Sequence, residues 1–136
     1  MVTLSKENYQ KILEYARKCY PEEACGLVAG QITDQGRLIQ EVYLLTNIDH
    51  SREHFSMDPK EQFLAVKDMR AKGLTPLGNW HSHPDTPSRP SDEDKRLAYD
   101  PHASYLILSL MDNDNPVFRS FHVEGDVATD ENLTIV

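Results

Sequence analysis

The amino-acid sequence predicts an α/β protein with a mixed, mostly antiparallel sheet flanked by helices. Short apolar segments typical of strands are interspersed with amphipathic segments typical of helices, without a regular alternation of the two. The later strand-like segments follow one another across turn residues, as in antiparallel hairpins. The chain has 136 residues, which is in the commonest size range for one domain, so we expect a single domain over residues 1–136.

The first third of the chain is expected to hold one helix and two strands. Residues 5–19 carry apolar side chains at helical spacing, Ser5 is a suitable cap at the start, and Pro21 ends the helix. The apolar segment 24–30 is short and ends in glycine, which suits a buried strand. Residues 38–46 follow a strand pattern, so we expect them to pair with segment 24–30 in a hairpin.

A second helix is predicted from Asp58 to about Lys72. Asp58 is expected to cap this helix, Pro59 to occupy its first position and Glu61 to reach back to the cap. Gly73 supplies the stop. An inward-facing apolar stripe is expected from the side chains that recur at every third position, Phe63, Val66 and Met69.

The second half of the chain is expected to contribute most of the remaining sheet. Residues 75–81 read as a strand, and residues 84–90 as an ordered loop, because they include three prolines and no large apolar side chain. The segments 104–110 and 117–123 are predicted to be strands joined by a turn. Residues 133–136 are expected to add an edge strand.

The composition excludes several classes of protein. There are 14 basic and 22 acidic residues, and a net charge of −8 argues against binding the phosphate backbone of nucleic acid. No apolar run is long enough to span a membrane, and the first residues lack a signal core, so we expect a cytoplasmic protein with no membrane association. Cys19 and Cys25 are too few for a disulfide framework, and we expect both to be buried thiols.

The segment 80–94, W-H-S-H-P-D-T-P-S-R-P-S-D-E-D, carries a pattern typical of a metal site. His81 and His83 are spaced i and i+2 at a strand end, so their side chains project to the same side. The proline-rich loop can reverse the chain and bring Asp94 beside them. Zinc accepts imidazole nitrogen and carboxylate oxygen, and three protein ligands leave a fourth position for a catalytic water. We therefore predict one zinc ion per chain, held by His81, His83 and Asp94.

This pattern resembles the JAMM motif of the MPN-plus zinc metalloproteases. The motif consists of H-S-H-P, seven residues between His83 and Ser91, and then S-x-x-D ending at Asp94. The family also places a glutamate in a sequence such as E-x-C-G, and Glu23 begins E-A-C-G here. The resemblance extends over nearly the whole chain, and it implies the MPN/JAMM fold, which is cytidine-deaminase-like.

The resemblance also implies the chemistry. His81, His83 and Asp94 would be the zinc ligands, Glu23 the general base and then the general acid, and Ser91 a donor to the oxyanion of the intermediate. The reaction would be hydrolysis of an amide bond. The short chain looks like the stand-alone prokaryotic members, which act on ubiquitin-like sulfur-carrier proteins. The expected substrate therefore ends in Gly-Gly followed by further residues or an adduct.

Simpler roles remain open for some of these residues. Ser91 and Asp94 also fit a capping box, in which the hydroxyl would bind backbone N–H groups, although we favour the oxyanion role. Glu23 could be a solvated charge near a helix end. We expect Cys25 to pack in the core rather than act as a nucleophile, and Trp80 to anchor the strand beneath the site. The four histidines outside this motif are expected to have packing or solvent roles only: His50, His54, His102 and His122.

Three other functions compete with a zinc peptidase. A non-catalytic MPN scaffold would have lost ligands, and all five motif residues are present. A RadC-like protein shares a similar H-x-H-P segment, but the acidic charge and the lack of a preceding DNA-binding module count against it. A zinc deaminase would need H-x-E and P-C-x-x-C elements, which the sequence does not contain.

Overall fold

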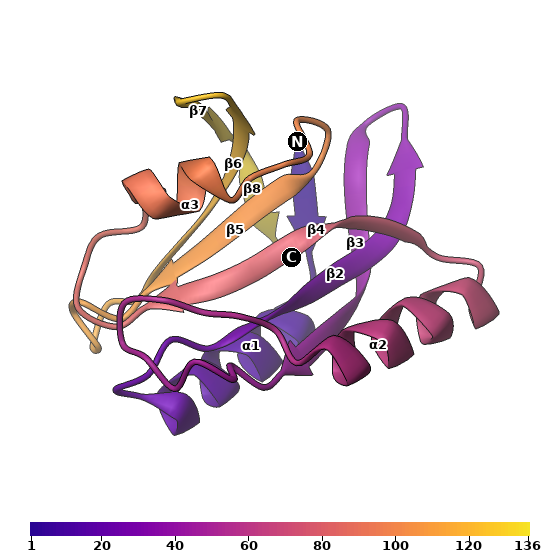
Figure 1. The fold of residues 1–136 in the computed structure, drawn as a ribbon. Coiled ribbons are helices and arrows are strands. Elements are labelled where there is room, and N and C mark those ends of the chain that lie inside the picture. Colours follow the sequence, from indigo (N-terminus) through magenta and orange to yellow (C-terminus); the bar gives the residue numbers. More distant parts are fainter.

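Figure 1 shows the computed structural model, which describes all residues from Met1 to Val136. The chain forms eight strands and three helices. In chain order these are β1 (Val2–Leu4), α1 (Lys6–Cys19), β2 (Cys25–Thr33), β3 (Gly36–Leu45), α2 (Pro59–Ala71), β4 (Thr75–His83), α3 (Asp92–Arg96), β5 (Ser104–Ser109), β6 (Val117–Glu124), β7 (Val127–Glu131) and β8 (Leu133–Ile135). None of the helices combines the length and hydrophobicity that crossing a bilayer requires.

All eight strands belong to one sheet, in the order β7-β6-β5-β4-β2-β3-β1-β8. The pairs β2–β3, β2–β4, β5–β6 and β6–β7 are antiparallel, whereas β1–β3, β1–β8 and β4–β5 are parallel. The prediction of a mixed, mostly antiparallel sheet with flanking helices is therefore confirmed. β4 lies in the interior of this sheet, hydrogen-bonded on both sides, and it carries the two candidate histidines.

The sheet curls strongly about α1. Its two edge strands, β7 and β8, are separated in the chain by Asn132 alone, so the two edges must lie close together. The carbonyl of Asn132 accepts a hydrogen bond from the backbone N–H of Val2 at 2.7 Å. The concave face of the sheet can therefore enclose one helix.

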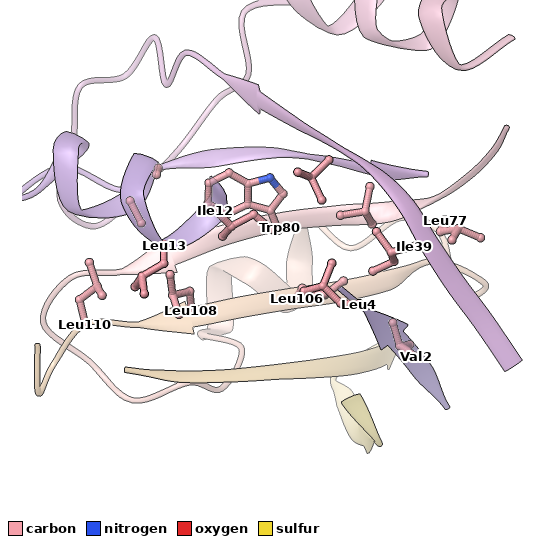
Figure 2. Close-up of a cluster of buried hydrophobic side chains, with 14 residues drawn as sticks. Val2, Leu4, Ile12, Leu13, Ile39, Leu77, Trp80, Leu106, Leu108 and Leu110 are labelled. Atoms are coloured by element: carbon pink, nitrogen blue, oxygen red, sulfur yellow. The ribbon is translucent and has the colours of Figure 1, made fainter. Parts of the chain in front are cut away.

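Helix α1 fills this concave face and forms the main core. Ser5 caps it as predicted, because the Ser5 hydroxyl accepts a hydrogen bond from the N–H of Asn8 at 3.1 Å. Ile12 and Leu13 of α1 lie in one cluster of 14 buried residues with Trp80 of β4, and Figure 2 shows these side chains between the helix and the strands. Burial of this apolar surface is the main stabilising contribution of the element.

Helix α2 lies on the opposite face of the sheet and begins and ends as predicted. The Asp58 carboxylate accepts hydrogen bonds from two N–H groups of the first turn, and Gly73 follows the helix with φ +68°. The expected reach of Glu61 back to the cap is wrong. Its carboxylate instead accepts hydrogen bonds from the backbone N–H and hydroxyl of Thr46, at 2.6 and 2.8 Å.

The predicted inward stripe of α2 is also largely wrong. Met69 is buried, but Phe63 and Val66 are 66% and 36% exposed, and Ala65 takes the inward position instead. Glu61, Ala65 and Met69 are spaced by four residues, so they share one face of the helix. A small side chain at Ala65 suits close contact with the sheet.

The remaining differences concern edges and strand ends. Strands β1 and β7 were not predicted, because each is short or mostly polar and depends on pairing with a neighbour rather than on its own pattern. The strand predicted over residues 75–81 continues to His83, so both histidines lie within it. Cys25 is fully buried as expected, whereas Cys19 is only partly buried against the core.

Candidate metal centre

His81 and His83 project from β4 on the face opposite α1. Residues spaced by two in a strand share a face, so both imidazole rings point away from Trp80 and the main core. Their strand is paired with β2 through Cys25↔His81 and with β5 through His81↔Ile107. Both rings are nearly inaccessible, at 3% and 5% exposed. The backbone that carries them is therefore held on both sides.

The alternate residues of β4 anchor the strand from the other face. Trp80 is fully buried, and its indole N–H donates to the carbonyl of Tyr43 at 3.1 Å, which confirms its predicted anchoring role. The Ser82 hydroxyl accepts from the N–H of Ala24 at 2.8 Å. A Cβ at Gly26 would lie 1.7 Å from the Tyr43 oxygen and 2.3 Å from the Trp80 indole nitrogen, so this contact explains the glycine of E-A-C-G.

Asp94 returns to the histidines through the proline-rich loop and the short helix α3. Two serine hydroxyls fasten the loop to β5: Ser88 donates to the carbonyl of Ile107, and Ser109 donates to the carbonyl of Thr86, each at 2.6 Å. Helix α3 then begins at its cap, Ser91, and places Asp94 in the first turn. The chain reversal predicted for this segment is confirmed.

The three predicted ligands converge on one point. The two Nε2 atoms of His81 and His83 are 3.1 Å apart, and Oδ2 of Asp94 lies 3.2 and 3.1 Å from them. Ligand atoms around a tetrahedral ion at about 2.0–2.2 Å stand about 3.3–3.6 Å from one another, so the cluster needs little expansion to take up zinc. It is the one group of histidine, cysteine and acidic side chains in the chain with this spacing.

The hydrogen bonds around the cluster set the protonation of these side chains. Nδ1 of His83 lies 2.9 Å from the carbonyl of Pro87, which can only accept, so Nδ1 carries a proton and Nε2 is the atom available to a metal. Burial acts to lower the pKa of His83, but hydrogen bonds to Asp94 and to the Pro87 carbonyl raise it, so a metal would displace a proton from Nε2. Burial lowers the pKa of His81, which keeps that ring neutral. Burial acts to raise the pKa of Asp94, but hydrogen bonds with the two histidines hold it well below its usual range. A neutral imidazole and a carboxylate are what a divalent metal binds.

Glu23 lies directly beside this cluster. It precedes β2, and because Cys25 pairs with His81 in an antiparallel register, Glu23 falls opposite His83. Its side chain is only 5% exposed, and Oε1 makes no hydrogen bond. Burial raises the pKa of Glu23 to about 8, against the opposing effect of nearby His83. The alternative of a solvated charge is therefore wrong for Glu23.

Ser91 forms a capping box with Asp94, which is the structural alternative that its sequence pattern also allows. Its hydroxyl oxygen accepts from the N–H of Asp94 at 3.0 Å, and its own N–H donates to Oδ2 of Asp94 at 2.9 Å. The hydroxyl proton takes no part in these two bonds and is free to be donated. The predicted contact with an oxyanion stays a prediction, since the capping role does not preclude it.

A small, partly open pocket adjoins His81 and Asp94. It lies between α3 and the face of β4, β5 and β6, and its wall is largely apolar. The residues that line it are His54, Phe55, Asn79, His81, Pro90, Glu93, Asp94, Leu97, Tyr105, Ile107 and Val123. Neither Glu23 nor His83 lines this pocket. The pocket faces β5 and β6, whereas Glu23 precedes β2, and these strands lie on opposite sides of β4 in the sheet.

Two residues near the site were missed from sequence. Phe55 stacks on the ring of His81, and Asn47 is buried and hydrogen-bonds to the backbone of Glu23. Both lie between β3 and α2, far in sequence from the motif, and no spacing pattern marks them. His54, expected to have a solvent or packing role, is half exposed and contacts Glu93 at 2.8 Å.

The chain is similar to several known proteins. It is 30% identical over 126 residues to the CysO-cysteine peptidase of Mycobacterium tuberculosis. This alignment covers 92% of this chain and 84% of the peptidase. It is 28% identical over 113 residues to the desampylase of Haloferax volcanii, covering 79% of this chain and 80% of that protein. The solution structure of protein DSY2949 from Desulfitobacterium hafniense is 51% identical and matches with a TM-score of 0.91, covering 100% of this chain and 93% of that one.

The family model for prokaryotic homologs of the JAB domain matches residues 5–123. This range begins at the cap of α1 and ends in β6, so it includes Glu23, Ser91 and the three clustered side chains. The matched family and the resemblance to JAMM/MPN-plus proteins agree. The chain therefore belongs to the prokaryotic JAB family of JAB/MPN proteins.

Proposed function

We propose that this protein is a zinc-dependent peptidase that hydrolyses an amide bond after the C-terminal Gly-Gly of a ubiquitin-like or sulfur-carrier protein. The observation that carries the proposal is the buried convergence of His81, His83 and Asp94 beside the buried carboxyl group of Glu23. Three ligands leave a coordination position open, which distinguishes a catalytic zinc site from a structural one. We also propose that residues 1–136 act as a single domain.

When bound to these ligands, zinc would polarise the scissile carbonyl group and make a water molecule more acidic. Glu23 is the acceptor for the proton of that water, because it is the buried carboxyl group next to His83. A cation at the cluster would favour ionised Glu23 by charge attraction. The pKa of Glu23, about 8 in the metal-free protein, would therefore fall when the metal binds. Glu23 then donates the proton to the leaving nitrogen.

Ser91 and the apolar pocket are assigned to the rest of the substrate. The Ser91 hydroxyl has a proton to donate to the carbonyl oxygen as negative charge develops there. Because Glu23 must reach the leaving nitrogen, the leaving residues lie on the Glu23 side of the cluster. The pocket beside His81 and Asp94 is then available to the carrier side of the scissile bond, and its wall favours an apolar side chain ahead of Gly-Gly.

The names of the relatives support this substrate class. One relative is named a CysO-cysteine peptidase and the other a desampylase, and both names describe enzymes that detach one molecule from another. The alignment with the CysO-cysteine peptidase covers 92% of this chain, so it includes the whole candidate site. We infer a related substrate for this chain on the basis of these two relatives and the site.

The test combines metal analysis with cleavage. Purified protein should contain one equivalent of zinc by mass spectrometry and should cleave a ubiquitin-like sulfur carrier extended beyond Gly-Gly, with loss of cleavage on chelation. Glu23→Gln should keep zinc and lose cleavage, whereas Glu22→Gln, a change at the half-exposed neighbouring carboxylate, should keep both. Failure to take up metal after zinc is supplied would rule out the proposal.

A further inference from the structure

One loop connects the segments that carry the candidate site residues. This 47–57 loop joins β3 to α2, and its ends pair with each other through a bridge between Asn47 and Met57. The N–H of Ile48 also donates to the carbonyl of Ser56 at 3.0 Å. The loop is therefore closed at its base, and its tip extends over the candidate site.

Asn47 holds the loop to the backbone of Glu23. Its side-chain amide donates to the carbonyl oxygens of Glu23 and His54 at 3.0 and 2.9 Å, while its Oδ1 accepts from the N–H groups of Asp49 and Ser56. The carbonyl of Ser51 in turn accepts from the N–H of Glu23 at 2.8 Å. A buried amide with both ends bonded fixes the loop relative to Glu23.

An ion pair and a histidine–carboxylate contact hold the tip of the loop to the other side of the site. Nε of Arg52 donates to Asp85 in the proline-rich loop at 2.9 Å, and Nδ1 of His54 lies 2.8 Å from Glu93 in α3. Glu93 is the neighbour of Asp94. The 47–57 loop thus bridges from the base residue to the helix that supplies the third ligand.

Phe55 places an aromatic ring on His81. The two ring centroids are 4.6 Å apart and the planes are inclined by 26°, which is a stacked arrangement. Nδ1 of His81 is buried and makes no hydrogen bond, whereas Nδ1 of His83 is held by the carbonyl of Pro87. A metal-binding histidine is ordinarily oriented by a hydrogen bond from its second nitrogen. His81 lacks that bond, so apart from the contacts of Nε2 with His83 and Asp94, the stacked ring of Phe55 is the contact that can orient it.

We propose that Phe55, held in place by Asn47 and the rest of the 47–57 loop, is a positioning residue that orients His81 for metal binding. The proposal rests on the metal role of His81 in the proposed function. It gives the two histidines different supports: a hydrogen bond for His83 and an aromatic ring for His81. Loss of the ring should therefore weaken metal binding without removing a ligand.

The test compares metal affinity in matched variants. Phe55→Leu keeps apolar contact with the cluster of Cys25, Leu45 and Ala65 but removes the flat ring. Phe55→Tyr keeps the ring, and Phe63→Leu makes the Phe-to-Leu change at an exposed site on α2. Each metal-free protein is titrated with zinc against a chromophoric chelator, and its cobalt(II) form is examined by visible absorption. Amide NMR spectra of the metal-free proteins establish that each variant is folded.

We expect Phe55→Leu to lose about 5- to 10-fold in zinc affinity and to change the cobalt absorption bands. Phe55→Tyr and Phe63→Leu should stay within about twofold of wild type. Wild-type affinity and an unchanged cobalt spectrum in folded Phe55→Leu would overturn the positioning role alone. Absence of metal binding by the wild-type protein would overturn the proposed function and this inference together.

Asn47→Asp provides a second measurement that does not alter the ring. The substitution keeps the size of the side chain but removes the N–H donors to the carbonyls of Glu23 and His54. Hydrogen exchange in residues 47–57 should become faster, and zinc affinity should fall, as it should in Phe55→Leu. Faster exchange with unchanged affinity would show that the loop does not position His81.

Discussion

Replacing Glu23 by glutamine should stabilise the metal-free protein at alkaline pH and have little effect at acidic pH. Burial raises the pKa of Glu23 in the folded protein to about 8, whereas its ordinary value is 4.5. Between these two values the unfolded chain has released the proton and the folded protein has kept it. The stability of the wild-type protein therefore falls as the pH rises from about 4.5 to about 8, and this loss is absent from Glu23→Gln.

The size of the effect follows from the same two values. Each pKa unit corresponds to about 1.36 kcal/mol, so the change from 4.5 to about 8 corresponds to at most about 5 kcal/mol in the free energy of unfolding. Urea unfolding in the presence of a chelator, at about pH 5 and about pH 9, measures this difference directly. Because both proteins share every other titrating group, the comparison isolates Glu23.

Glu22→Gln is the matched control for this experiment. The Glu22 side chain is half-exposed and pairs only with His50, so its replacement should leave the pH profile of stability close to that of wild type. If the profiles of wild type and Glu23→Gln were parallel from about pH 5 to about pH 9, the carboxyl group would not be buried as described, and the argument for its proton affinity would fail.

Three further perturbations test the site and its support. His83→Ala should eliminate bound metal and cleavage together, and stoichiometric zinc in that variant by mass spectrometry would contradict the ligand assignment. Leu97→Asp, in the wall of the pocket, should raise KM for the carrier about tenfold while metal content stays unchanged; an unaltered KM would exclude the pocket from substrate binding. Gly26→Ala should lower the free energy of unfolding by about 3 kcal/mol, because its Cβ would meet Tyr43 and the Trp80 indole, and a wild-type urea midpoint would refute this.

Local sequence patterns predicted the part of the site that lies within residues 81–94, whereas Glu23 was predicted only from the resemblance to the JAMM family. His81 and His83 share a face because of the strand period, and the proline-rich segment before Asp94 signals a chain reversal. The same locality explains the success of the caps at Ser5 and Asp58, whose partners lie within the next turn. Local geometry carries the information for these caps and for the histidine pair.

The predictions were wrong or incomplete where a side chain contacts a residue that is distant in the sequence. Glu61 has a suitable spacing for a capping box, yet it bonds to Thr46 across the junction of β3 and α2. Phe63 fits a three-residue stripe, but the face of α2 that meets the sheet follows a four-residue spacing. Asn47 and Phe55 act through contacts with Glu23 and His81, which are distant in sequence, so no local pattern reveals them.

The five-residue helix α3 would couple binding of the proposed metal to local folding. It buries none of its own residues, and a helix of this length has little stability in isolation. Its capping box uses the same Asp94 carboxylate that completes the cluster, so the bonds that fold the turn also present the third ligand. If the proposed metal binds there, metal occupancy and the population of folded α3 would be thermodynamically linked, and each would raise the other. When the metal ion is scarce, this turn would unfold first, while β4 and the rest of the sheet stay folded.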